Sequence, residues 1–263
     1  MPGNKLIRKS ARGAKYKSFV LRRGNVLYKR SKLSAIMKTV ILAGGFGKRL
    51  KPLTDTRPKP MILVSDVPII EWQMRWLSKF GIREFVLCVG YMKDQIIDHI
   101  GNSMKLNCRV DYSVEEEPLG TGGALLNAQG LLSNEASFFL VNGDILTELD
   151  PNRLTMPHSN TLALVPLRSQ FGLVEVDDNL RVLRFVEKPE IQDRWINAGI
   201  YCFTQEIFRY LPKKGNVEVT TLPALANEGK LRAIKYQKVF WRSIDSHKDI
   251  DEAAKEMPPI NLP

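Results

Sequence analysis

The chain has 263 residues, which is enough for one large α/β domain with a substantial core. Its hydrophobic fraction of 44% and charged fraction of 25% are ordinary for a globular protein, and no apolar run approaches the ~20 residues that a membrane helix needs. The net charge of +11 is local: residues 1–38 hold 12 of the 39 Lys and Arg and no Asp or Glu, which leaves 27 basic against 28 acidic residues elsewhere.

A domain boundary is therefore predicted near Met37. We expect residues 1–36 to be a basic extension that is either disordered or a consequence of start-codon choice, and we favour the second explanation. A basic arm could also touch RNA or acidic surfaces, so a nucleic-acid partner is expected only through these residues. Residues 37–257 form the predicted domain, and residues 258–263 a short tail.

From Met37 the pattern alternates between strands and helices. An apolar strand is predicted over 39–42 and is followed by a glycine-rich loop. Pro68 begins a helix with apolar residues at helical spacing, and Gly81 ends it. Further strands are predicted over 84–90, 109–114 and 137–142, with helices over 92–100 and 122–131.

Beyond Asp150 the predicted strands become shorter. They cover 161–166, 172–176, 182–187 and 198–203, and helices are predicted over 205–211, 221–228 and 248–257. The order of elements predicts a single α/β domain with a Rossmann-like, doubly wound and mostly parallel mixed sheet. The second half should continue this sheet and form the acceptor side of a cleft.

The cysteine and histidine residues give no sign of a metal site. Cys88, Cys108 and Cys202 lie in apolar runs without CxxC spacing, so we expect buried, reduced thiols and a cytoplasmic location. The three histidines are scattered along the chain and are assigned no catalytic role.

Three glycines, Gly44, Gly45 and Gly47, follow the first strand at the edge of the sheet where ligands bind. Their missing side chains allow backbone N–H groups to approach an anion closely. Positive charge suited to phosphate follows. It is supplied by Lys48, Arg49 and Lys59.

General phosphate-binding motifs do not fit this loop. A Walker loop needs Ser or Thr after Gly-Lys, and Arg49 stands there. A Rossmann fingerprint needs a third glycine where this chain has Leu50.

The stretch LAGGFGKRLKPLTDTRPKP, from Leu42 to Pro60, resembles the signature of the sugar-1-phosphate nucleotidyltransferases, or NDP-sugar pyrophosphorylases. It departs from that signature at Lys48, where the family usually has Thr or Ser. The resemblance implies the nucleotide-diphospho-sugar transferase fold and a loop that wraps the triphosphate. It also implies that Arg49 holds the β- and γ-phosphates and that Lys59 contacts the reacting phosphates. The implied nucleotide contacts are Leu42, Ala43, Gly44, Gly45, Gly47, Lys48 and Arg49.

Later motifs extend the resemblance in the family's order. The segment 117–124, EPLGTGGA, resembles the base-recognition loop, and Asp144 in Asn-Gly-Asp takes the place of the metal-binding aspartate. With Arg49 and Lys59, Asp144 completes the implied catalytic set. The implied nucleotide contacts in the base loop are Glu117, Pro118, Gly120 and Thr121. The implied sugar-phosphate contacts are Gly172, Glu187, Lys188 and Asn197.

The second metal ligand depends on the C-terminal motif, Phe-Trp-Arg-Ser-Ile-Asp. Many members have Trp-x-Asp-Ile-Gly here, and Ser243 stands at the position of that aspartate. The cytidylyltransferase branch instead has a motif like Phe-Trp-x-x-Met-Asp-Thr at this place. When this chain is aligned with that motif, Asp245 matches its aspartate, and we therefore predict Asp245 as the second ligand. The alternative is that Asp245 only caps the helix that begins near Lys248.

The resemblance implies a Mg²⁺-dependent enzyme that joins a nucleoside triphosphate to a sugar 1-phosphate and releases pyrophosphate. Mannose-1-phosphate guanylyltransferases are the most similar branch, which predicts GTP with mannose 1-phosphate. Glucose 1-phosphate with UTP, dTTP or CTP, and heptose 1-phosphate, remain alternatives. A catalytically silent nucleotide-binding module and an RNA-associated protein are alternatives of another class. Family members often assemble, so a homo-oligomer is compatible with the resemblance, and no membrane partner is expected.

Overall fold

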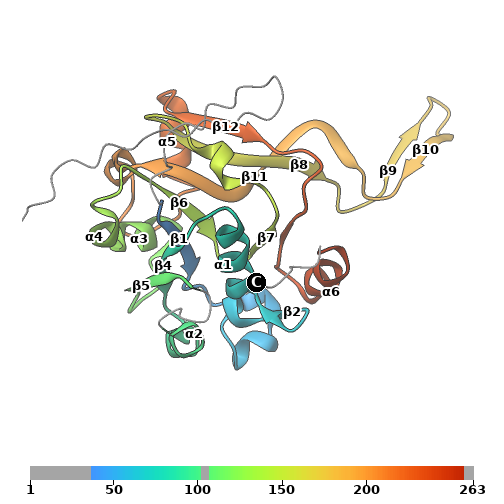
Figure 1. The fold of residues 1–263 in the computed structure, drawn as a ribbon. Coiled ribbons are helices and arrows are strands. Elements are labelled where there is room, and N and C mark those ends of the chain that lie inside the picture. Colours follow the sequence, from blue (N-terminus) through green and yellow to red (C-terminus); the bar gives the residue numbers. More distant parts are fainter. Residues whose placement is uncertain (1–36, 102–106, 258–263) are drawn as a thin grey trace, which may run out of the picture. The chain divides into compact units, whose positions relative to one another are not determined.

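A seven-stranded sheet forms the centre of the computed structural model, which describes residues 37–101 and 107–257 (Figure 1). All of these residues belong to one compact unit, Ile36–Pro263. The predictions for residues 1–36 and 258–263 lie outside the described residues. In spatial order the strands are β12 (Leu231–Lys235), β8 (Asn160–Arg168), β11 (Glu190–Thr204), β6 (Ser137–Asn142), β1 (Thr39–Ala43), β4 (Glu84–Val89) and β5 (Arg109–Val114).

The sheet is mixed and mostly parallel, as predicted. Strands β5, β4, β1 and β6 pair in parallel, and β12 is parallel to β8. Strand β11 is antiparallel to both of its neighbours, β6 and β8. Because four adjacent strands run in one direction, their carboxyl ends meet at one edge, where the loops that follow them can form a common site.

Helices cover both faces of the sheet because alternate residues of each strand point to opposite sides. Ile41 of β1 packs in one core with Met74 of α1 (Ile69–Lys79) and Ile96 of α2 (Lys93–Ile100). Val40 packs in a second core with Leu125, on the opposite face. The helices of that face are α3 (Gly120–Asn127), α4 (Gln129–Leu132) and α5 (Thr221–Asn227).

A third core lies beside the sheet. It joins the loop after β1 to the short hairpin of β2 (Leu63–Val64) and β3 (Val67–Pro68), to the pair formed by β7 (Ile145–Thr147) and β13 (Trp241–Ser243), and to α6 (His247–Glu256). Leu50 and Ile244 are both buried in it. Two segments that are distant in sequence are therefore fixed side by side.

Several predicted elements differ from the observed ones. The helix predicted over 122–131 is divided at Ala128 into α3 and α4, and the helix predicted over 205–211 is the 3₁₀ helix η6 (Gln205–Arg209). Strand β11 extends well before the predicted start at residue 198. The short strands β2, β3, β7, β12 and β13 were not predicted, because two to five residues carry too little periodic pattern.

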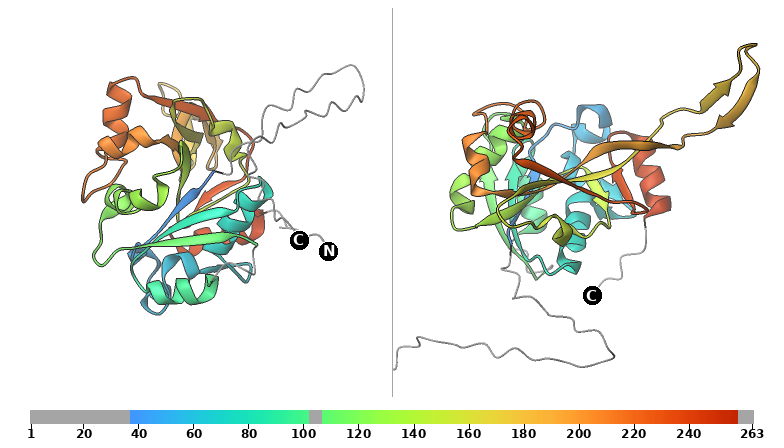
Figure 2. Two further views of the ribbon diagram at one scale, coloured as in Figure 1. Left: turned by 60° about the vertical axis from the view of Figure 1, so that its left-hand side comes forward. Right: turned by 90° about the horizontal axis from the view of Figure 1, so that it is seen from above.

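The second half continues the main sheet through β8, β11 and β12, as expected, with one exception. Strands β9 (Leu173–Val176) and β10 (Val182–Val186) form a separate antiparallel hairpin that projects from the rest of the domain (Figures 1 and 2). All four residues of β9 are exposed. Their apolar pattern is that of a buried strand, so the sequence could not reveal that the hairpin lacks a covering layer.

None of the helices in the described residues combines the length and apolar character that crossing a membrane requires. Cys88 and Cys202 are buried as predicted, whereas Cys108 is half-buried just before β5. No disulfide joins these three cysteines.

Candidate active site

A cleft with a volume of about 420 Å³ lies at the carboxyl ends of β1 and β6, against the start of α3. Its volume falls within the range of pockets that bind small molecules. It brings together most of the nucleotide, catalytic and metal residues predicted from sequence. The predicted residues that line it are Leu42, Gly44, Gly45, Gly47, Lys48, Arg49, Lys59, Pro118, Gly120, Thr121, Asp144 and Asp245.

The glycine-rich loop is tightly folded. Gly47 has a positive φ of 60° and precedes the 3₁₀ helix η1 (Lys48–Leu50). A Cβ atom on Gly47 would lie 2.9 Å from side-chain atoms of both Lys59 and Thr54, so neither the backbone angle nor the space admits a side chain. The Gly47 carbonyl also accepts hydrogen bonds from the Leu50 amide (2.9 Å) and the Thr54 hydroxyl (3.1 Å).

Two carboxylates and two cationic side chains meet beside this loop. Lys59 Nζ donates hydrogen bonds to Asp144 Oδ2 (2.8 Å) and to Asp245 Oδ1 (3.0 Å). Arg49 Nη2 donates to the same Asp245 oxygen at 2.7 Å. Lys59 begins the 3₁₀ helix η3 (Lys59–Met61) and is flanked by Pro58 and Pro60, which restrict its backbone.

Asp245 is held as a carboxylate in this cluster. Burial by itself raises the pKa of Asp245, but the Ser243 hydrogen bond and the charges of Lys59 and Arg49 together lower it below its ordinary value. Ser243 Oγ donates to Asp245 Oδ2 at 2.8 Å. The alternative that Asp245 only caps the next helix is wrong, because Ser246 is the N-cap of α6 and forms a capping box with Asp249.

The two carboxylates fit a hard divalent cation. Their oxygens converge on one ammonium nitrogen, so a single cation can contact both. No cluster of three or more His, Cys, Asp or Glu side chains suited to a metal ion occurs within residues 37–101 and 107–257. Two carboxylates suffice for Mg²⁺, which takes its other ligands from water and substrate phosphates.

The loop that enters α3 is anchored by a second segment of chain. Thr121 Oγ1 donates to Glu218 Oε2 at 2.7 Å and accepts from the Val217 amide at 2.9 Å. Gly120 has a φ of +75°, and a Cβ atom there would lie 2.6 Å from the Gly215 carbonyl oxygen. The predicted base loop therefore has little freedom to move away from residues 215–218.

Glu115 lines the cleft but was missed by sequence reasoning. It directly follows β5, its Oε2 accepts a hydrogen bond from the Leu119 amide (3.1 Å), and burial raises its pKa. The sequence signal for Glu115 was its position directly after a predicted strand. The motif that resembles the base-recognition loop begins only at Glu117. Glu117 does not line the cleft and instead forms an exposed ion pair with Lys214 (2.9 Å). Ala43 is buried and does not line it either.

Asn142 was also missed, although it lines the cleft at the end of β6. Its side chain packs against Gly199, where a Cβ atom would lie 3.0 Å from Asn142 Nδ2. Asn142 stands in the Asn-Gly-Asp motif, two residues before Asp144. Its place in this motif, at the end of a predicted strand, was the sequence signal that Asn142 belongs to the site.

The predicted sugar-phosphate residues do not line the cleft. Gly172 and Glu187 lie together at the base of the β9–β10 hairpin, where a Cβ atom on Gly172 would be 3.1 Å from Glu187 Oε2. Lys188 lies near Glu187 and close enough to α6 for its charge to act on Glu252. Asn197 donates through Nδ2 to the Tyr201 hydroxyl at 2.6 Å.

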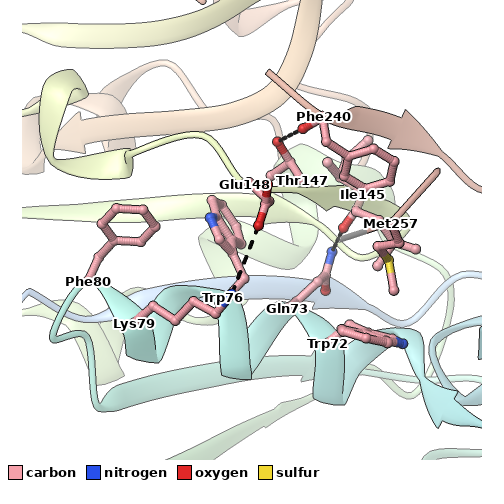
Figure 3. A pocket seen from close by; sticks show the side chains of 11 residues that line it. Trp72, Gln73, Trp76, Lys79, Phe80, Ile145, Thr147, Glu148, Phe240 and Met257 are labelled. Carbon is pink, nitrogen blue, oxygen red and sulfur yellow. Dashed lines mark hydrogen bonds and ion pairs between the residues drawn. The ribbon is translucent and has the colours of Figure 1, made fainter. Parts of the chain in front are cut away.

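A second, smaller pocket of about 90 Å³ lies between α1 and β7 (Figure 3). Its lining is mostly apolar, with Trp72 and Trp76 on the helix side and Phe240 opposite. The glycine-rich loop and the paired carboxylates do not contribute to it. Since it is too small for a nucleotide, the larger cleft is the candidate active site.

A doubly wound sheet whose glycine-rich loop, cationic side chains and paired carboxylates meet at the carboxyl edge defines a nucleotide-binding α/β protein. Residues 38–258 match the sequence model of the family described as Nucleotidyl transferase, and the chain belongs to this family.

Individual relatives agree with this assignment. The chain is 35% identical over 225 residues to the mannose-1-phosphate guanylyltransferase catalytic subunit beta of Danio rerio. That alignment covers 81% of this chain and 62% of the relative, so the chain spans less than two thirds of the length of this curated protein.

Solved structures show the same fold. HddC from Yersinia pseudotuberculosis is 30% identical, with a TM-score of 0.68 over 84% of this chain and 100% of its own. HddC has also been solved in complex with GMP-PN. A putative glucose-1-phosphate thymidylyltransferase from Bacillus anthracis, at 20% identity, has a TM-score of 0.70 over 86% of this chain and 97% of its own.

Proposed function

We propose that this protein transfers a nucleotidyl group from a nucleoside triphosphate to a sugar 1-phosphate, forming an NDP-sugar and pyrophosphate. The observation that carries the proposal is the meeting of Arg49, Lys59, Asp144 and Asp245 beside the glycine-rich loop. This arrangement supplies anion-binding backbone, mobile positive charge and a cation site within one cleft.

The reaction needs positioning and charge neutralisation more than covalent chemistry by the protein. A sugar-phosphate oxygen attacks the α-phosphorus in line, and pyrophosphate leaves. Lys48 and Arg49 stabilise the leaving pyrophosphate, while Lys59 and Lys188 orient the attacking phosphate. Asp144 and Asp245 would hold Mg²⁺, which would supply neutralisation of the crowded phosphate charge.

Guanine is the proposed base. The curated relative named above is a guanylyltransferase, and Glu115 provides a carboxylate in the cleft. Guanine presents two adjacent donors, N1–H and the 2-amino group, which a carboxylate can accept together. Uracil and thymine present a single N–H between two carbonyl oxygens, which a carboxylate would repel.

Mannose 1-phosphate is the proposed acceptor, by similarity to the relatives' named substrate. Gly172, Glu187, Lys188 and Asn197 remain the proposed sugar-phosphate contacts. None of the four lines the cleft: Gly172, Glu187 and Lys188 lie at the base of the β9–β10 hairpin, and Asn197 lies on β11. We also infer a cytoplasmic location, because the chain has only three cysteines and they lack CxxC spacing.

The test is pyrophosphate release with Mg²⁺, crossing GTP, CTP, UTP, dTTP and ATP against mannose, glucose and heptose 1-phosphates. We expect release only when both substrates are present, and fastest with GTP and mannose 1-phosphate. A different best pair would keep the reaction and correct the substrates. If the folded protein released no pyrophosphate with any pair but was still stabilised against heat by a nucleotide, it would be a binding module and not an enzyme.

A further inference from the structure

We propose that Lys59 occupies the cation position between Asp144 and Asp245 in the nucleotide-free protein, so that its ammonium group and a divalent metal ion compete for the same two carboxylates. The inference rests on the proposed function only in taking these carboxylates as metal ligands. It adds that Lys59 alternates between two partners: the carboxylates before metal binds, and substrate phosphate afterwards.

The geometry of the ammonium group carries the inference. Lys59 Nζ lies 2.8 Å from Asp144 Oδ2 and 3.0 Å from Asp245 Oδ1, so both oxygens surround one point. A Mg²⁺ ion at that point would need oxygens at about 2.1 Å, which the carboxylates can reach by closing in by less than about 1 Å. The ammonium and the ion cannot share this space, because both need direct contact with the same oxygens.

The surroundings of Lys59 limit where it can go. Its side chain is only 14% exposed, and its stem packs against Gly47, where a Cβ atom would lie 2.9 Å from Lys59 Cβ. Lys59 also lines the cleft beside the glycine-rich loop. Once displaced, the ammonium would therefore turn into the cleft, where the phosphates are proposed to bind.

The balance of charge indicates when displacement occurs. Asp144 and Asp245 are matched by Lys59 and Arg49, so the cluster is neutral without a metal. A divalent ion alone would leave two excess positive charges, which the triphosphate then compensates. Arg49 is 77% exposed and can move into solvent, so Lys59 is the principal competitor.

The opposing view is that Lys59 is a scaffold that keeps two mutually repelling carboxylates in place for the metal. The two views predict different changes in metal affinity when the charge of Lys59 is removed. Competition predicts tighter metal binding, whereas scaffolding predicts weaker or unchanged binding. The substitution Lys59→Met keeps an unbranched stem that can pack against Gly47 and removes only the charge.

The experiment titrates Mn²⁺ into wild type and Lys59→Met without nucleotide, following free Mn²⁺ by electron paramagnetic resonance. We expect Lys59→Met to bind Mn²⁺ about tenfold more tightly or better, because two partly buried ion pairs no longer oppose the metal. Lys48→Ala is the matched control: Lys48 lines the same cleft but forms no ion pair with either carboxylate in the described part of the chain. Its affinity should change less than about threefold. Equal or weaker binding by Lys59→Met would overturn the proposal.

A second measurement uses the wild-type protein and covers the case in which Lys59→Met does not fold. Acetic anhydride labelling with mass spectrometry reports how accessible the Lys59 amine is. We expect labelling of Lys59 to rise several-fold when Mn²⁺ is added and to stay constant in Asp144→Asn; no rise in wild type at saturating Mn²⁺ would refute displacement. Neither measurement uses turnover, so failure of the proposed reaction and failure of this inference remain distinguishable.

Discussion

Arg49 Nη2 and Asp245 Oδ1 are joined by a hydrogen bond of 2.7 Å, although the two residues are 196 positions apart in the chain. Their immediate neighbours explain this contact. Leu50 and Ile244 are both buried in the third core, which clamps the loop after β1 to the segment before α6. Apolar packing therefore sets the position of a polar pair, and four charged groups are assembled at the mouth of one cleft.

We expect Asp144→Asn to reduce pyrophosphate release by at least about 100-fold, since the site loses one of its two cation-binding carboxylates. Turnover is measured with GTP, mannose 1-phosphate and Mg²⁺, and circular dichroism checks the fold. Asp55→Asn is a control for charge alone, because Asp55 pairs with Lys51 at an exposed position outside the cleft. Full activity in Asp144→Asn would remove Asp144 from the proposed metal site.

Glu115→Gln should weaken the preference for GTP by about tenfold or more, because the amide offers a donor where guanine needs an acceptor. The measurement is kcat/KM for GTP and for UTP with one sugar phosphate. Glu116→Gln is the matched control, since Glu116 is 85% exposed and pairs with Lys93 outside the cleft. Because burial raises the pKa of Glu115, the GTP preference of wild type should also decline at acidic pH. An unchanged ratio of the two kcat/KM values in Glu115→Gln would assign base recognition elsewhere.

Gly47→Ala and Gly45→Ala should differ in stability although the two positions are neighbours. Gly47 has φ +60°, and a Cβ atom there would lie 2.9 Å from Lys59 and Thr54, so the alanine should cost about 1–3 kcal/mol. A Cβ atom on Gly45 meets nothing within 4 Å, so that change should cost less than about 1 kcal/mol. Urea unfolding of both variants gives the comparison, and equal losses would contradict the strain assigned to Gly47.

Glu71→Gln should destabilise the protein at neutral pH but much less in acid. Burial by itself raises the pKa of Glu71, but hydrogen bonds from Arg75 and His99 lower it below its ordinary value of 4.5. The stabilisation is therefore complete above 4.5 and is lost as the pH falls through the lower folded-state pKa.

Urea unfolding at pH 7 should show a cost of about 1 kcal/mol for Glu71→Gln, and near pH 3 the wild-type and variant curves should approach each other. A constant difference at both pH values would mean that the charge of Glu71 does not carry the effect.

Much of this protein was determined by local sequence. The apolar run of β1, the helical spacing in α1 and the order of strand and helix patterns predicted the doubly wound sheet, since such periodicities depend on nearby residues only. The glycine-rich loop was predictable for the same reason. Three glycines after a buried strand place backbone N–H groups at the carboxyl edge, whatever the rest of the chain does.

Tertiary structure alone decided which side chains meet. Asp245 was a ligand candidate by resemblance, but its contact with Lys59 depends on the third core, in which Leu50 and Ile244 are both buried. The β9–β10 hairpin has the pattern of a buried strand pair and yet projects from the domain. Both outcomes depend on contacts between segments far apart in the chain, and a local pattern records how much apolar surface a segment has but not what covers it.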